Sequence, residues 1–212
     1  LANGINLANG INLANGINLA NGVPQAWVTP TSGSSLRKWL DSSPTNKLQF
    51  EVQAAKNLLD AYLAAGNGDG ANLRVQIVTF SISAQAWTTQ WVDIQQAKEI
   101  LNQIGAMTPD GNTNYDAGIQ QALAVTWTPA NGAIPGATNS TYFFSDGLPN
   151  ENNDGTDGLN GAQATAWINE LKADDINAYA IGMIDDGVDK DAAQNELNKI
   201  AYNGKTETNT DA

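Results

Sequence analysis

Apolar residues recur along most of the chain at the spacing of amphipathic helices separated by short apolar runs. The clearest helical pattern covers 48–65, where Leu48, Val52 and Leu59 recur at the spacing of one buried helix face. Gly66 follows as a stop signal. The same spacing predicts further helices at 94–104, 117–125, 162–172 and 190–200.

Short runs rich in β-branched and aromatic residues predict the strands between these helices. Strands are expected at 25–29, 73–80, 84–91, 141–144 and 176–181. Only a few residues separate 84–91 from 73–80, so the two are expected to pair as an antiparallel edge. After Ala201 the chain is polar and offers no strand. Strands that alternate with helices of ten or more residues predict an α/β fold: a doubly wound, Rossmann-like and mainly parallel central sheet with helices on both faces.

The first 22 residues repeat Leu-Ala-Asn-Gly-Ile-Asn three times and then add Leu-Ala-Asn-Gly. A hexapeptide period can indicate a β-helix, but this segment makes only about one coil, too little to bury a core alone. An Asn-Gly pair in every unit favours turns. Residues 1–22 are therefore interpreted as a low-complexity lead-in to a domain at 23–212. The identity of the copies also leaves an engineered or generated sequence open.

Composition restricts the classes of partner and of chemistry. The chain has 212 residues, of which 22 are acidic and 10 basic, for a net charge of −12. Nucleic acid and anionic membrane surfaces are not expected as partners of such a chain, since phosphate contacts need clustered Lys and Arg. The sequence holds no Cys and no His, so a metal ion must be held by oxygen. No apolar run reaches the roughly 20 residues of a membrane span, and no signal peptide opens the chain.

Enzymatic function is not expected. Nucleophilic and metal-hydrolase mechanisms usually rely on His or Cys as catalytic residues, and this chain has neither. Two carboxylates can act on a glycoside, but nothing in the sequence places such a pair around a cleft. A dinucleotide site is not indicated either, because no Gly-x-Gly-x-x-Gly follows a strand.

Three oxygen-bearing segments follow predicted strands or precede helices. They are Ser32-Gly33-Ser34, Asn112-Thr113-Asn114 and Ser145-Asp146-Gly147. Hydroxyls with one carboxylate make a ligand set for a hard cation such as Mg²⁺, Ca²⁺ or Mn²⁺. Taken alone, Asp146 would be read as the cap of a turn. Two acidic clusters are expected to be solvated or to cap helices, as Asp189 can do for the last helix. The first cluster comprises Asp154 and Asp157, and the second comprises Asp185, Asp186, Asp189 and Asp191.

These segments together resemble the von Willebrand factor type A domain, also called the integrin I domain. The adhesion site of that family combines Asp-x-Ser-x-Ser after the first strand, a Thr in a later loop and an Asp after the fourth strand. Ser32, Ser34, Thr113 and Asp146 match four of these five positions. The resemblance covers about residues 23–200. Stretches such as Tyr142-Phe-Phe-Ser-Asp-Gly-Leu-Pro149 look most like domains of large bacterial repeats-in-toxin adhesins.

The sequence departs from the family pattern at the first Asp. Pro30 stands at that position and supplies neither a ligand oxygen nor an N–H, so a cation site is expected to be weakened or lost. A second register exists in Asp41-Ser42-Ser43-Pro44-Thr45, which spells Asp-x-Ser-x-Thr. The Ser32/Ser34 register is preferred, because the lead-in to Asp41 carries two adjacent cations and makes a poor central strand. The last strand and helix of the family are also not found after Ile200, and 203–212 is interpreted as no more than the truncated start of that missing strand.

The resemblance implies an extracellular or cell-surface adhesion module. A bound Mg²⁺ or Ca²⁺ would coordinate a carboxylate presented by a protein or surface partner, with no membrane insertion and with the module monomeric. The alternative is a scaffold of the same fold, natural or designed, whose metal site has been silenced by the loss at Pro30.

Overall fold

The computed structural model describes residues 4–11, 47–65, 72–108, 112–124, 129–145, 148–183 and 189–209, with 4–11 and Ala65 described by their backbone alone. All the predicted helices are present. The helices are α1 Lys47–Ala65, α2 Ile94–Gly105, α3 Tyr115–Leu123, the short 3₁₀ helix η4 Pro129–Asn131, α4 Gly161–Ala173 and α5 Lys190–Asn198. Helix α3 begins two residues before its predicted start, because Asn114 caps it.

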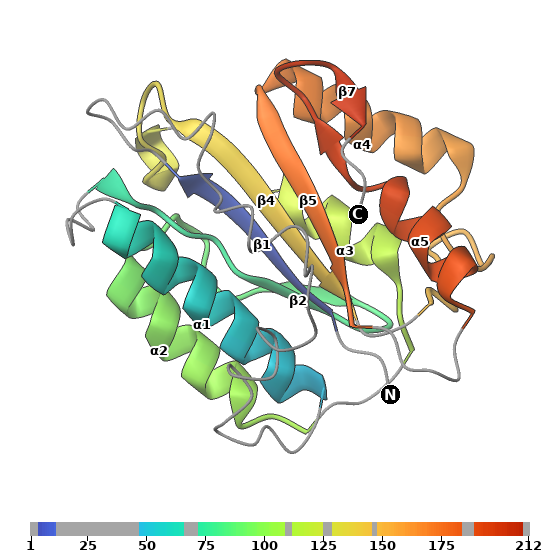
Figure 1. The fold of residues 1–212 in the computed structure, drawn as a ribbon, viewed down its shortest axis with the longest axis horizontal. Helices are drawn as coiled ribbons and strands as arrows, with labels where there is room; N and C mark the ends of the chain where they lie inside the picture. The colour runs from blue at the N-terminus through green and yellow to red at the C-terminus, as the bar shows by residue number, and fades with distance from the viewer. Residues whose placement is uncertain are drawn as a thin grey trace, which may run out of the picture.

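The strands form one sheet with helices on both faces (Figure 1). They are β1 Gly4–Ile11, β2 Val78–Phe80, β3 Ala84–Ala86, β4 Thr138–Ser145, β5 Ile176–Gly182, β6 Tyr202–Asn203 and β7 Thr208–Asn209. Their order in this seven-stranded sheet is β3-β2-β1-β4-β5-β6-β7. The α/β, doubly wound class is confirmed, and so is the antiparallel pairing of β3 with β2.

Strand direction differs from the predicted mainly parallel sheet. Among the described strands only β4 and β5 pair in parallel, and the other neighbours are antiparallel. Short connections explain the antiparallel pairs at the two ends, since a hairpin needs few residues and a parallel crossover needs a dozen or more. Because β1 is antiparallel to both β2 and β4, these two strands run in the same direction and their carboxyl ends share one edge of the sheet.

Two segments expected to lack strands contain them. Residues 4–11 of the repeat form β1 between β2 and β4, so the expectation of turns is wrong for this part of the lead-in. Ile5, Leu7 and Ile11 lie at alternate positions of the chain, a spacing compatible with one face of a strand. After Ala201, β6 and β7 form a short hairpin on the edge of β5, which corrects the second expectation. The predicted strand at 25–29 lies outside the described residues.

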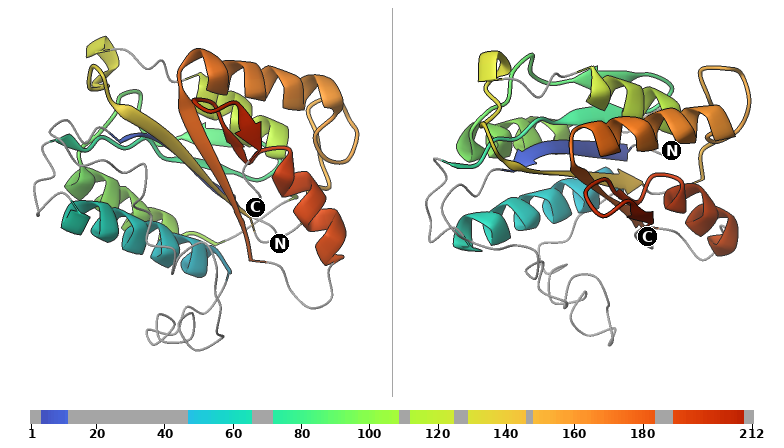
Figure 2. Two further views of the ribbon diagram at one scale, coloured as in Figure 1. Left: turned by 45° about the horizontal axis from the view of Figure 1, so that its top comes forward. Right: turned by 90° about the horizontal axis from the view of Figure 1, so that it is seen from above.

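Two hydrophobic cores cover the opposite faces of the sheet. Figure 2 shows α1 and α4 on opposite sides of the strands. The alternation along β4 divides its side chains: Tyr142 and Phe144 join the core under α1 and α2, and Phe143 joins the core under α3, α4 and α5. Trp167 of α4 is buried in the second core. Both faces of β4 are therefore covered, which fixes the position of its carboxyl end.

Candidate metal-binding edge of the sheet

Thr113 lies at the edge of the sheet where β2 and β4 end. The backbone N–H of Asn114 donates to the carbonyl of Ser81, directly after β2, at 2.8 Å. Asn114 also forms a parallel bridge with Glu151, which follows β4. The loop that carries Thr113 is thus held between the segment that follows β2 and the segment that follows β4, two strands that run in the same direction. This is the edge at which open α/β sheets place ligands and ions.

Asn114 fixes the start of the helix that follows Thr113. Its side-chain Oδ1 accepts a hydrogen bond from the N–H of Ala117 at 2.9 Å, which is the geometry of a helix N-cap. Its Nδ2 donates to the carbonyl of Ile82 at 3.1 Å and to Oδ1 of Asn153 at 2.9 Å. One side chain therefore joins the helix start to the loops after β2 and β4.

The hydroxyl of Thr113 is buried and has no hydrogen-bond partner among the described residues. The residue has no exposed surface, and its Oγ1 is an unsatisfied polar atom. Leaving such a group without a partner costs about 1–3 kcal/mol. A hydroxyl oxygen in this state fits a ligand of a hard cation, which would supply the missing interaction.

The backbone of Thr113 is held by the segment after β4. Its N–H donates to the side-chain Oδ1 of Asn150 at 2.7 Å. Its carbonyl accepts from the N–H groups of Asn150 and Glu151 at 3.1 and 3.3 Å. The side chain of Asn112 donates to Oε1 of Glu151 at 2.6 Å. Thr113 and its neighbour Asn112 are therefore tied to the same two positions.

The loop after β4 is anchored in turn on α4. Asn152 is buried and exchanges two side-chain hydrogen bonds with Gln163, at 2.8 and 2.6 Å. Asn160 caps α4 and forms a capping box with Gln163. On the inner side of the edge, the hydroxyl of Tyr115 donates to Oγ of Ser145, the last residue of β4, at 2.9 Å. The hydrogen bonds around Thr113 are thus connected to helix α4 and to the buried strand β4.

The structure describes one of the four predicted ligands. Thr113 is buried at the sheet edge, and Ser32, Ser34 and Asp146 lie outside the described residues. The second register from Asp41 to Thr45 and the anomalous Pro30 also lie outside them. The described part of the chain contains no group of three or more His, Cys, Asp or Glu side chains placed to hold a metal ion. The assignment of Ser32, Ser34 and Asp146 therefore remains a prediction.

Asp189 and Asp154, two of the clustered acidic residues that the structure describes, act as a helix cap and as a loop residue. Asp189 caps α5 by accepting the N–H of Ala192 at 3.0 Å, as predicted. Asp154 accepts from the hydroxyl of Thr156 at 2.6 Å and from the side chain of Asn160. These hydrogen bonds, the one from Thr156 first, lower the pKa of Asp154 below its ordinary value. Asp185 and Asp186 lie outside the described residues.

Asn150 and Glu151 were not predicted as part of the site. Their signal in the sequence is the position just after Pro149, which stops the strand and leaves the next polar residues at the sheet edge. That signal does not say which loop they bind, because their partner Thr113 is 37 positions away from Asn150.

Comparison with known proteins assigns most of the chain to one family. The von Willebrand factor type A domain family matches residues 40–211. This range includes Asp41, Ser43, Thr45, Thr113 and the position of Asp146, and it leaves Ser32 and Ser34 outside. Neither a curated protein nor a solved structure matches the sequence. No helix among the described residues is long and apolar enough to cross a membrane.

Proposed function

The chain belongs to the von Willebrand factor type A domain family, and we propose that it is an extracellular module whose divalent cation coordinates an acidic group of a partner. Domains of this family bind protein ligands and commonly hold a divalent metal. The observation that carries the proposal is the buried Oγ1 of Thr113, which lacks a partner among the described residues at the edge where a cation would lie. A neutral hydroxyl ligand leaves the cation electron-poor, so the ion favours a further carboxylate from outside.

We assign Thr113 and Asp146 to the site and compare two registers for the first motif. The family match begins at residue 40, which supports Asp41, Ser43 and Thr45. Helix α1 begins at Lys47, separated by one residue from the end of this motif, so the motif lies close before a helix N-terminus. This register also restores a second carboxylate, Asp41, to the site. It removes the deficit that Pro30 creates in the Ser32/Ser34 register.

The partner we propose is a protein or surface molecule that presents a carboxylate. Mg²⁺ and Ca²⁺ both suit oxygen ligands, and Mn²⁺ is the third cation to test. The module acts by binding at the outer surface of a cell, as a monomer and without an enzymatic step. The bacterial adhesins that the sequence resembles give the kind of assembly in which such a module would work.

The experiment that tests the proposal replaces Thr113 with valine. In chelator, Thr113→Val should raise stability by about 1–3 kcal/mol, because it removes a buried hydroxyl without a partner among the described residues. In Mg²⁺ at 100 times its Kd, the wild-type chain should gain about 2.7 kcal/mol of unfolding free energy. A tenfold weaker affinity in the variant would reduce that gain by about 1.4 kcal/mol. Calorimetric unfolding in chelator, Mg²⁺, Ca²⁺ and Mn²⁺ measures both effects.

The matched control is Thr79→Val in β2. The hydroxyl of Thr79 accepts a hydrogen bond from the Trp87 indole at 3.0 Å, so its removal should lower stability in chelator and leave the gain from Mg²⁺ intact. No gain from any cation in the wild-type chain would contradict the proposal. An unchanged gain in Thr113→Val would show that a bound cation does not use this hydroxyl.

A silenced scaffold is the second candidate, and Pro30 is the observation that favours it. If the first motif lies at Ser32 and Ser34, the site lacks one carboxylate. Two further variants separate the registers. Loss of the Mg²⁺ gain in Asp41→Ala but not in Ser34→Ala supports an intact site at Asp41. Loss in Ser34→Ala alone supports the register beside Pro30, and absence of any gain leaves the scaffold as the function.

A further inference from the structure

We propose that Asn150 is a positioning residue that holds the backbone of Thr113 so that the threonine hydroxyl is aimed at a bound divalent cation. The inference deepens the proposed function and rests on it. The proposed function concerns the hydroxyl of Thr113 as a ligand, whereas this inference concerns the side chain of Asn150. Asn150 acts through Thr113 and need not touch the ion. The juxtaposition that carries it is the set of three hydrogen bonds between Asn150–Glu151 and the two peptide groups of Thr113.

These hydrogen bonds fix Thr113 from both sides of its α-carbon. The N–H is held by the Asn150 side chain at 2.7 Å, and the carbonyl is held by the N–H groups of Asn150 and Glu151 at 3.1 and 3.3 Å. With both peptide planes held, the direction of the bond from Cα to Cβ is set. Only the rotation about that bond remains for the hydroxyl, and the complete burial of the side chain restricts it.

Glu151 and Asn112 add a second tie on the same loop. The Asn112 side chain donates to Oε1 of Glu151 at 2.6 Å and accepts at longer range, 3.5 Å, from Nδ2 of Asn150. Asn112 and Thr113 are adjacent, so the contact prevents the loop from sliding by one residue relative to the segment after β4. The register of the two loops is therefore determined by side chains as well as by the backbone.

The segment that holds Thr113 is itself anchored to helix α4. Asn152, two residues after Asn150, is buried and pairs with Gln163 of α4 through two side-chain hydrogen bonds. The same glutamine closes the capping box of that helix. The hydrogen bonds to Thr113 thus come from a segment that is anchored in the protein interior. Such support is needed to hold a ligand atom in place.

Positioning matters here because a hydroxyl is a weak, neutral ligand. Its contribution depends on its already pointing at the ion, and partners that orient the ligands of a metal typically control its affinity by about 10–100-fold. Asn150 also follows Asp146 by four positions in the sequence. One short stretch therefore carries the predicted carboxylate and the side chain that orients the threonine.

The experiment is Asn150→Ala in the full chain, with Mg²⁺ affinity measured by titration calorimetry. The Asn150 side chain is exposed, so its truncation leaves no cavity and the variant should fold. We expect the Kd for Mg²⁺ to rise about 10–100-fold. Asn139→Ala is the matched control: it removes one asparagine hydrogen bond, to the carbonyl of Asp174 at 3.2 Å, at the opposite edge of the sheet. We expect its Kd to equal that of the wild-type chain.

A second measurement tests the contact without any metal. Amide hydrogen exchange in chelator should show the Thr113 N–H exchanging about fivefold faster or more in Asn150→Ala, the factor that one net hydrogen bond provides. The N–H of Ala117, bonded to the Asn114 cap, should keep its protection. Asn150→Asp retains the acceptor oxygen and should restore the protection of Thr113.

The outcomes separate this inference from the proposed function. If the wild-type chain binds no cation, both are overturned. If it binds a cation and Asn150→Ala binds it equally well, the positioning role is overturned and the proposed function stands. Thr113 protection that is unchanged in Asn150→Ala overturns the contact itself, whatever the cation result. Weaker binding with faster Thr113 exchange, and neither effect in Asn139→Ala, supports the inference.

Discussion

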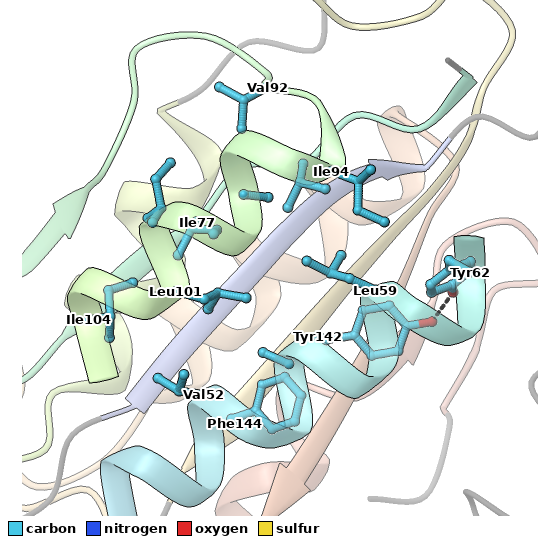
Figure 3. Packing of buried hydrophobic residues seen from close by; sticks show 14 of the residues in the cluster. Val52, Leu59, Tyr62, Ile77, Val92, Ile94, Leu101, Ile104, Tyr142 and Phe144 are labelled. Carbon is cyan, nitrogen blue, oxygen red and sulfur yellow. Dashed lines mark hydrogen bonds between the residues drawn. The ribbon is translucent and has the colours of Figure 1, made fainter. Parts of the chain in front are cut away.

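Tyr62 and Tyr142 form a buried pair in which two phenol groups share one hydrogen bond. Figure 3 shows the bond between the two hydroxyls, one from the last turns of α1 and the other from β4. The rings meet edge to face with centroids 6.2 Å apart, and Tyr142 stacks on Tyr179 at 5.0 Å. Burial raises the pKa of Tyr62 to about 12. Burial and the neighbouring Tyr62 also raise the pKa of Tyr142 well above its ordinary value.

The raised pKa values of this pair predict a loss of stability in alkaline solution. Above about pH 10 the unfolded chain loses its phenolic protons, while the folded chain keeps that of Tyr62 up to about pH 12. The contribution is therefore fully present below about pH 10 and disappears as the pH rises toward the folded value. A tenfold difference in proton affinity between the folded and unfolded chain is worth about 1.4 kcal/mol. Urea unfolding between about pH 9 and pH 12 should show the free energy of unfolding falling.

Tyr62→Phe is the variant that isolates this effect. It should cost about 1 kcal/mol near neutral pH, since the hydroxyl of Tyr142 loses its partner. Between about pH 10 and pH 12 its stability should fall less steeply than that of the wild-type chain. Equal slopes in the two proteins would mean that Tyr62 does not titrate differently in the folded and unfolded states.

At the scale of an element, the β6–β7 hairpin depends on one glycine. Gly204 follows β6, and its N–H donates to the carbonyl of Ile176 at 2.9 Å. A Cβ added at this position would collide with the backbone carbonyl of Leu171, and would lie 2.7 Å from the carbonyl oxygen of Ile176. Backbone atoms of α4 and β5 cannot move aside as a flexible side chain can. At Gly204 the hairpin therefore lies closer to the backbone of α4 and β5 than a residue with a side chain would allow.

Gly204→Ala should cost about 3 kcal/mol of stability or more, the upper part of the range for overpacked sites. The measurement is chemical denaturation, with Gly136→Ala as a contrasting glycine variant. Gly136 has no atom within 4 Å of the added Cβ, although its positive φ of 73° disfavours alanine. A cost for Gly204→Ala no larger than that for Gly136→Ala would show that the hairpin can shift outward.

Elements with a strong local pattern were predictable, and those defined by distant partners were not. Leu48, Val52 and Leu59 recur at helical spacing, and the helix they predicted begins one residue early and ends at the same residue. Strand β6 has two residues, and nothing in Tyr202–Asn203 distinguishes it from a loop without its neighbour β5. The direction of β1 was also not predictable. Its pairing is decided by β2 and β4, which are far away in the sequence.

The same distinction applies to the candidate site. Thr113 was predicted as a ligand from its motif; the structure shows it buried at the edge where β2 and β4 end, and its role as a ligand stays a prediction. Asn150 was missed, because its role depends on a hydrogen bond to a residue in another loop. A strand-end asparagine after a proline is common in turns, so composition alone does not mark it as part of a site.

At the scale of the whole molecule, the surplus of negative charge opposes folding and also attracts cations. The net charge is −12, and the described ion pairs join Lys98 with Asp60, Lys172 with Glu207, and Lys199 with Glu196. Surface pairs of this kind contribute little. Self-repulsion in the folded chain is therefore relieved mainly by salt, and every cation, including Mg²⁺, gives some stabilisation by screening alone.

Screening and specific binding are separable at matched ionic strength. Raising NaCl from about 0.01 M to about 0.15 M shortens the Debye length from about 30 Å to about 8 Å, so the melting temperature should rise in the wild-type chain and in Thr113→Val alike. A change of 1 kcal/mol corresponds to about 2–4 °C for a chain of this size. Replacing NaCl by MgCl₂ of equal ionic strength should raise it further in the wild-type chain, and much less in Thr113→Val. An equal further rise in both proteins would mean that Mg²⁺ acts on the acidic surface as a whole, and the cation would then have no site at Thr113.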